Sequence, residues 1–293
     1  MPAVSQFDPD AVFNAWLATL AGIVTDSRAL FWWPTLATAL LGALILWAVN
    51  AGRPADALST EPGTLSAFLR EMPGDIACYL GYTFTQVLMA KALFWATVGG
   101  VSLVFLIART VPVPTVTAAF SEHLAVAALA FVLSDFCLYW SHRLFHGPRT
   151  LWWFHRLHHN PPVLTPITAF RFWPPEAACH FAAFNFGEGV ALGIANLAFG
   201  ANITPAAYLG VNVFLLAWSL AFSHLRHSHV ALYYPRWLSH ILVSPHMHQA
   251  HHSVDPRHYQ SNFGTALALW DWMFGSLYIP GKGERFRFGV AHG

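Results

Sequence analysis

Long, nearly uncharged apolar runs constrain the fold of this chain more than any other feature of its sequence. Residues 29–49 contain no charged side chain, and residues 92–108 form a second run of the same kind. Three further apolar runs follow at residues 118–141, 177–199 and 203–223. A helix needs about 20 mostly apolar residues to cross the hydrocarbon layer of a bilayer, so the sequence predicts an all-α integral membrane helical bundle with about 4–6 membrane helices.

The composition excludes several other classes of protein. Charged residues make up 10% of the chain and hydrophobic residues 56%, whereas a soluble domain has about 25% charged residues. The net charge of the chain is only +1. Proteins that bind nucleic acid through electrostatics carry a strong positive charge, so no nucleic-acid partner is expected. Three cysteines are too few for a disulfide framework or a cysteine-rich metal module.

Interruptions of the apolar pattern suggest three parts. Residues 1–117 are expected to form N-terminal membrane helices and a loop, and residues 50–75, with their Gly, Pro and charges, are the predicted aqueous loop. Residues 118–280 form a histidine-rich unit, and residues 281–293 a C-terminal tail. Arginines gather after residue 141 and again in the C-terminal part, so the tendency of positive loops to stay inside predicts that this side faces the cytoplasm.

Histidines are the second unusual feature, because 15 of the 17 lie between His142 and His258. On an α-helix, positions i, i+3 and i+4 share one face, with Cβ atoms about 5–6 Å apart. Histidines at this spacing therefore aim their imidazoles at a common point. The boxes are HxxxH at His142 and His146, HxxHH at His155, His158 and His159, HxxHH again at His248, His251 and His252, and a denser HLRHSH group at His224, His227 and His229.

This spacing predicts metal binding. Neutral imidazole is the commonest metal ligand in proteins, and imidazoles buried together without a metal would each need another polar partner. The first three boxes alone hold eight histidines, whereas one metal ion takes about four ligands. The sequence therefore predicts a dinuclear site with these eleven histidines as candidate ligands, and it leaves open which of the HLRHSH histidines bind. His180, alone in an apolar stretch, is expected to be structural.

The residues around the boxes resemble the fatty acid hydroxylase superfamily, also called the sterol desaturase family. The resemblance covers roughly residues 120–280. It implies a di-iron centre on a cytoplasmic-side, His-rich helical cap, and a catalytic domain over residues 118–280. The single family histidine of the HLRHSH region corresponds to His227. The matching motifs are Asp135-x3-Tyr139-Trp140-x-His142, Leu151-Trp152-x2-His155, Ser244-Pro245 before His248, Asn262-Phe263-Gly264 and Trp270-Asp271-x2-Phe274-Gly275.

Two acidic residues are expected to support the catalytic site. Asp135 lies seven residues before His142, two helical turns back on the same face, and Asp271 follows the last box. Histidines that bind a metal almost always donate their other ring N–H to an acceptor. Asp135 and Asp271 are therefore predicted to accept hydrogen bonds from ligand imidazoles.

The resemblance also implies a reaction and its partners. Two Fe ions would activate O₂ to hydroxylate or desaturate a C–H bond of a lipid, whether a fatty acyl chain, a sterol, a carotenoid or an ether lipid. The lipid would enter from the bilayer. The chain has no His-Pro-Gly-Gly segment and no Cys-x-x-Cys pair, so electrons would come from a separate ferredoxin, rubredoxin or cytochrome. Zinc may substitute for iron in a purified sample, since imidazole sites accept both.

Two other functions compete with this interpretation. A zinc-dependent membrane hydrolase acting on a lipid would use metal-activated water and a nearby Glu base, as in H-E-x-x-H. No box contains such a Glu. A metal transporter would place its histidines inside the membrane helices, whereas these boxes flank the apolar runs.

Overall fold

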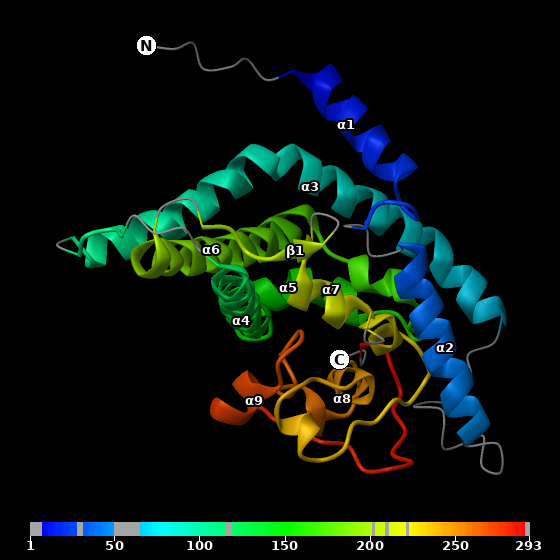
Figure 1. The fold of residues 1–293 in the computed structure, drawn as a ribbon. Coiled ribbons are helices and arrows are strands. Elements are labelled where there is room, and N and C mark those ends of the chain that lie inside the picture. The colour runs from blue at the N-terminus through cyan, green and yellow to red at the C-terminus, as the bar shows by residue number, and fades with distance from the viewer. Residues whose placement is uncertain are drawn as a thin grey trace.

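The structure is a computed structural model that describes residues 8–27, 32–49, 65–109, 111–114, 119–200, 203–208, 211–220 and 223–290. Helices dominate these residues (Figure 1). Two short strands, β1 (Ala207–Tyr208) and β2 (Val211–Asn212), pair antiparallel. The α-helices are α1 (Pro9–Ala21), α2 (Trp33–Val49), α3 (Leu65–Ile107), α4 (Phe120–Phe145), α5 (Arg149–His159), α6 (Pro174–Phe199), α7 (Val213–Leu220), α8 (Pro245–His251) and α9 (Leu269–Met273).

Three helices among the described residues, α3, α4 and α6, are long and apolar enough to cross a membrane. The shorter α2 is apolar over Trp33–Ile45. The all-α membrane fold is thus confirmed, with fewer long helices than the four to six expected. The expected span over 203–223 is wrong. Its described part holds the β1–β2 ribbon and the eight-residue α7, and such a helix reaches only about 12 Å.

α3 is one helix of 43 residues. Residues 65–75, expected in the aqueous loop, are its first turns, and residues 50–64 of that loop lie outside the described residues. At about 1.5 Å per residue α3 measures roughly 64 Å, twice the hydrocarbon thickness. Figure 1 shows it arching over α6. Its outer face is apolar and exposed, for example at Phe94 and Trp95, as expected of a surface in contact with lipid.

α6 lies between α3 and α4 and packs closely against both. Gly189 faces the carbonyl of Thr97 in α3, and Gly187 faces the carbonyl of Leu133 in α4. A Cβ atom at either glycine would overlap those backbone atoms. Small residues that let helix backbones approach are the usual means of association inside a membrane. The three long helices therefore form one packed unit.

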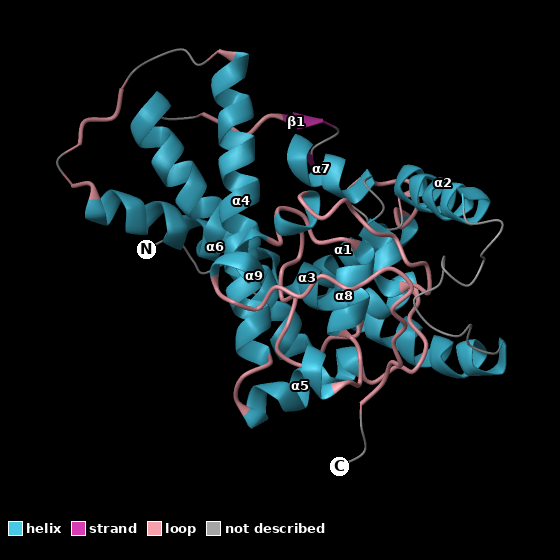
Figure 2. Ribbon diagram, turned by 90° about the horizontal axis from the view of Figure 1, so that it is seen from below, coloured by secondary structure: helices cyan, strands magenta, loops and turns pink. Residues whose placement is uncertain are grey.

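The C-terminal His-rich segments lie on one side of this unit, with α8, α9 and the C-terminal residues below it in Figure 1 and toward the viewer in Figure 2. Tyr139 of α4 joins the two parts through a buried cluster with Phe263, Leu267 and Trp270. The described part of the predicted tail, residues 281–290, does not stand apart. Its Phe286 and Phe288 pack in a buried cluster with Leu164 and Ala250 of the His-rich region.

Candidate metal centre

The histidine boxes converge on two neighbouring groups of imidazoles whose rings contact each other directly. Within each group, one ring nitrogen per residue lies within 4.8 Å of all the others. The rings come from α4, α5, the 3-10 helix Ser223–His227 and α8. The first cluster is His142, His146, His155, His159 and His251, and the second is His158, His227, His248 and His252.

The two HxxHH boxes each serve both clusters. In α5, His155 and His159 are four residues apart and point into the first cluster, while His158 points into the second. In α8 and at the residue that caps its C-terminus, His248 and His252 share the second cluster and His251 joins the first. Positions i and i+4 are rotated by about 40°, whereas position i+3 falls on the other side of position i. Because the histidine at i+3 enters the other cluster, each HxxHH box contributes ring nitrogens to both clusters.

Distances within the clusters match those between ligands of one metal ion. The His142 Nε2 atom lies 3.0 Å from His251 Nε2 and 3.1 Å from His155 Nε2. In the second cluster, His227 Nε2 lies 3.2 Å from His248 Nε2 and 3.3 Å from His158 Nε2. Nitrogens bound at about 2.0–2.1 Å and separated by about 90–109° lie about 2.8–3.4 Å apart. The described side chains therefore fit two metal ions.

Hydrogen bonds on the far side of two rings fix which nitrogen carries the proton when each ring is neutral. His142 Nδ1 donates to the Phe263 carbonyl at 2.8 Å, and His251 Nδ1 donates to the Ser261 carbonyl at 2.7 Å. A neutral imidazole carries one N–H, so each Nε2 presents a lone pair. Two lone pairs facing each other at 3.0 Å repel unless a cation lies between them.

Glu176, at the start of α6, is the residue of this site that sequence reasoning missed. Its side chain is fully buried and accepts a hydrogen bond from His155 Nδ1. His180 Nε2 lies 3.5 Å from the same carboxylate oxygen, and His180 Nδ1 contacts the Ser141 hydroxyl at 2.8 Å. Glu176 is therefore the acceptor that orients a ligand imidazole. It lies outside every histidine box, and its local signal in the sequence is the i, i+4 spacing to His180.

His224 and His229 lie outside both clusters, so among the described residues the structure brings only His227 of the HLRHSH group into a cluster. His224 Nε2 contacts the Thr35 hydroxyl of α2 at 3.0 Å. His229 packs near Phe288, and neither ring nitrogen has a hydrogen-bond partner among the described residues. In a 3-10 helix, three residues advance the chain by about 6 Å. His224 therefore lies one turn away from the cluster that His227 enters.

A family model for fatty acid hydroxylases matches residues 127–276, just over half of the chain. The chain belongs to the fatty acid hydroxylase family. The matched region contains all nine clustered histidines and Glu176. Membership confirms the resemblance that the box motifs indicated.

A curated relative gives a second comparison. Over 154 residues the chain is 25% identical to the Delta(7)-sterol 5(6)-desaturase erg3B of Aspergillus fumigatus. The alignment covers 53% of this chain and 39% of that relative, so the chain matches well under half of the relative's length. No solved structure matches this member of the family.

The two predicted acidic residues do not contact imidazoles in this family member, which corrects the sequence expectation. Both carboxylates instead bind the loop that follows α8 and carries the acceptor for His142 Nδ1. A buried carboxylate is stabilised by several backbone donors, and this loop supplies them. Asp135 accepts from Ala266 N, Leu267 N and the Trp270 indole, while Asp271 accepts from Phe263 N, Gly264 N and the Ser276 hydroxyl.

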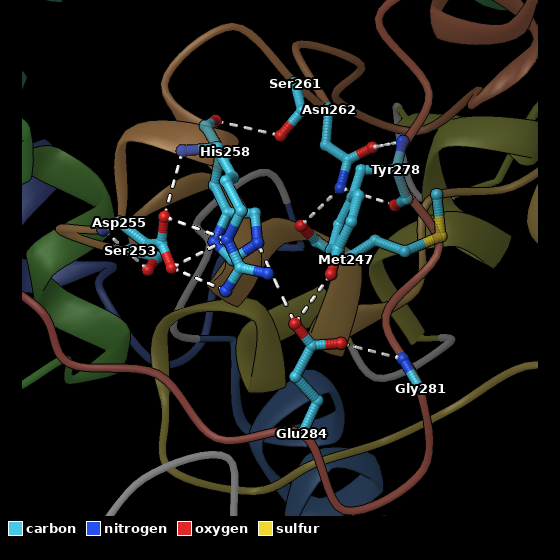
Figure 3. A network of polar contacts seen from close by, with 10 residues as sticks. Met247, Ser253, Asp255, His258, Ser261, Asn262, Tyr278, Gly281 and Glu284 are labelled. Atoms are coloured by element: carbon cyan, nitrogen blue, oxygen red, sulfur yellow. Dashed lines mark hydrogen bonds and ion pairs between the residues drawn. The ribbon is translucent and has the colours of Figure 1, made fainter.

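Asn262 shapes the same loop from the other side (Figure 3). Its φ of 56° places it in the left-handed region, where Asn is one of the few side chains tolerated. Its Nδ2 donates to the carbonyls of Met247 and Tyr278, and its Oδ1 accepts from Tyr278 N. The next carbonyl back, Ser261 O, is the acceptor for His251. The loop is therefore built to present carbonyls to ligand imidazoles.

Replacing Asp135 by alanine is expected to lower the free energy of unfolding by roughly 3 kcal/mol, because it leaves three buried donors without a partner. Asp135→Asn, which keeps one acceptor oxygen, should cost less. Thermal unfolding of the purified variants in detergent measures both effects. An Asp135→Ala protein as stable as the parent would contradict the role given to this carboxylate.

The cluster histidines outside the membrane helices are held in their neutral form. Burial lowers the pKa of His159, His248 and His252 well below the usual value for histidine. Burial also lowers the pKa of His251 to about 4. Neutral imidazole is the form that binds metal, so the clusters are ready to bind ions at neutral pH without first losing protons.

The metal-free protein is expected to lose stability as the pH falls below about 6.5, the value for an unfolded histidine. A group whose pKa is lower in the folded state stabilises the fold above its unfolded pKa, and this contribution disappears as the pH approaches the folded pKa. His251 alone, with a folded pKa of about 4, accounts for roughly 3 kcal/mol. Melting temperatures of chelator-treated protein at pH 7.5 and pH 5 test this, and equal values would contradict it.

Two cavities reach the clusters from different sides. One, of about 380 Å³, touches only the first cluster, at His146, His159 and His251, and is bordered by Arg149 and Tyr259. The other, of about 460 Å³, touches both clusters. Its wall combines imidazoles of both clusters with apolar groups of α4, of α6 and of the segment before α6. These residues are His142, His155, His158, His227, His248, Leu138, Phe172, Phe181 and Phe184.

Proposed function

We propose that this chain is a membrane-bound non-haem di-iron oxygenase that hydroxylates or desaturates a C–H bond of a lipid. The observation that carries the proposal is the 460 Å³ cavity, which imidazoles of both clusters and apolar side chains line together. All-nitrogen clusters suit iron as well as zinc. Bound iron would supply O₂ activation. An apolar substrate in this cavity would lie directly against both clusters.

The chain itself contributes binding, orientation and exclusion of water. Leu138, Phe172 and Phe181 give the cavity an apolar wall, which favours hydrocarbon over water. The cavity borders α3, α4 and α6, the helices suited to a membrane, and this supports entry of the lipid from the bilayer. The substrate is a sterol, an acyl chain, a carotenoid or an ether lipid. The name of the relative erg3B, a sterol desaturase, supports the sterol among these classes.

A separate ferredoxin, rubredoxin or cytochrome is proposed as the electron donor, docking at the 380 Å³ cavity. That cavity reaches the first cluster without passing through the lipid cavity, and Arg149 lies at its edge. The arginines of this region also favour a cytoplasmic position for the active site through the tendency of positive loops to stay inside. An acidic donor protein would find complementary charge there.

A zinc-dependent hydrolase acting on a lipid is the second candidate, because Glu176 lies beside a cluster where a general base would be needed. One oxygen of Glu176 already accepts from the ligand His155, and the residue is fully buried. This arrangement favours orientation of a ligand over activation of water.

The test compares the parent protein with a variant in which His158 and His159 are both replaced by alanine. Expected results are two irons per chain, one for each cluster, reductant-dependent O₂ uptake, and a lipid that gains one oxygen atom or loses two hydrogens only with the parent protein. Zinc-dependent ester or ether cleavage without O₂ would overturn the oxygenase and support the hydrolase. No change in any lipid class would remove the proposed substrate.

A further inference from the structure

A second chamber lies beside the lipid cavity, and no clustered histidine lines it. This chamber has a volume of about 410 Å³, against about 460 Å³ for the cavity at the clusters. The two chambers share part of their walls, so a lipid that extends from one into the other would follow a path between α3, α4, α6 and α7. The shared residues are Tyr82, Phe170, Phe184 and Leu215.

One face of α6 follows this path from the metal clusters to the second chamber. Glu176, His180, Phe184 and Glu188 are each four residues apart, and residues at this spacing lie on one side of a helix. His180 lines the cavity at the clusters, Phe184 lines both chambers, and Glu188 lines the second. Eight residues separate His180 from Glu188, a distance of about 12 Å along the helix axis.

Glu188 differs from the other polar residues of the second chamber. It makes no hydrogen bond or ion pair with the described part of the chain, although it lies partly buried within a membrane helix. An acidic side chain inside a membrane segment is costly and usually serves a ligand. The serine, threonine and asparagine residues there have partners within the protein, and Tyr82 makes ring contacts with its neighbours. Those with partners are Ser27, Thr35, Ser134, Asn212 and Ser219.

We infer that Glu188 binds a hydroxyl group at the end of the lipid substrate that points away from the metal clusters. The inference rests on the proposed function, since it assumes that the lipid in this path is the one oxidised. A hydroxyl suits the site because it donates to a carboxylate and accepts from a carboxylic acid. The bond that is oxidised then lies on the order of 12 Å from that hydroxyl. Glu188 is thus a specificity-determining residue.

Binding of matched alcohols and hydrocarbons to the purified full chain tests this inference without any turnover. The probes are octadecan-1-ol with octadecane and cholestanol with cholestane, so that both linear and polycyclic lipids are covered. The parent protein should bind the alcohol of at least one pair about tenfold more tightly than its hydrocarbon, as a hydrogen bond to a charged group gives. Glu188→Leu should lose this preference, and Glu188→Gln should keep most of it.

Metal content serves as the control for folding, because Glu188 lies outside both clusters. The inference fails if the parent shows no preference in either pair, or if a Glu188→Leu protein with full metal content keeps the preference. Alcohol binding that depends on Glu188 in a protein without oxygenase activity would uphold the site and reject the proposed function. A preference for octadecylamine over octadecan-1-ol would overturn the hydroxyl and assign a cation instead.

Discussion

Replacing His251 by alanine is expected to reduce the metal content of the protein from about two ions per chain to about one and to abolish lipid oxidation. His251 lies at the centre of the first cluster, with its Nε2 3.0 Å from His142 Nε2 and its Nδ1 held by Ser261 O. Mutation of a residue that hydrogen-bonds to a metal ligand costs about 10–100-fold in metal affinity or activity. Loss of the ligand itself should cost at least as much. The second cluster keeps all four histidines.

Metal analysis of the purified variant, together with O₂ uptake, measures both parts of this expectation. His229→Ala is the matched control, since His229 belongs to the same group of boxes but lies outside both clusters. It should retain both metal ions and the parent activity. A His251→Ala protein with two tightly bound ions would contradict the assignment of His251 as a ligand. Loss of metal from His229→Ala would contradict the placement of His229 outside both clusters.

Replacing Glu176 by alanine is expected to lower metal affinity about 100-fold, the upper end of the range for partners of metal ligands. Glu176 is the acceptor for His155 Nδ1 and also lies near His180. Without it the His155 ring loses its orientation, and a buried N–H is left unpaired. Glu176→Gln keeps an acceptor oxygen but not the charge, so it should lose only about tenfold.

Competition with a chelator gives the affinity directly and does not depend on turnover. Glu122→Gln is the control, because Glu122 lies at the far end of α4 from the clusters, where it bonds to Ala119 N. Its metal affinity should equal that of the parent. Unchanged affinity in Glu176→Ala would show that the carboxylate does not support the centre, and His155 would then need another acceptor.

The sequence predicted the metal centre better than it predicted the helices around it. Nine of the eleven candidate histidines converge in the structure, because the i, i+3, i+4 spacing is a local property of helices. Hydropathy found α3, α4 and α6, but not that α3 is continuous through residues 65–75 or that α7 is short. Apolar runs show where a chain avoids water, and they do not show where a helix ends.

Other features became visible only in three dimensions. Asp135 lies 131 residues from its partner Ala266, and Glu176 lies 21 residues from His155. Hydrogen bonds across such separations follow no local period, so the sequence suggested wrong partners for Asp135 and Asp271 and did not mark Glu176. The role proposed for Glu188 likewise depends on the chamber that this side chain lines.

The sequence by itself determined that this chain is a helical membrane protein of the fatty acid hydroxylase family with histidines at the spacing of metal ligands. It could do so because hydropathy and helical spacing are properties of neighbouring residues. Only the tertiary structure decided which histidines share a cluster, which carbonyls and carboxylate orient them, and where a lipid can lie. These depend on contacts between α4, α5, α6 and α8, and packing brings those segments together only when the whole chain folds.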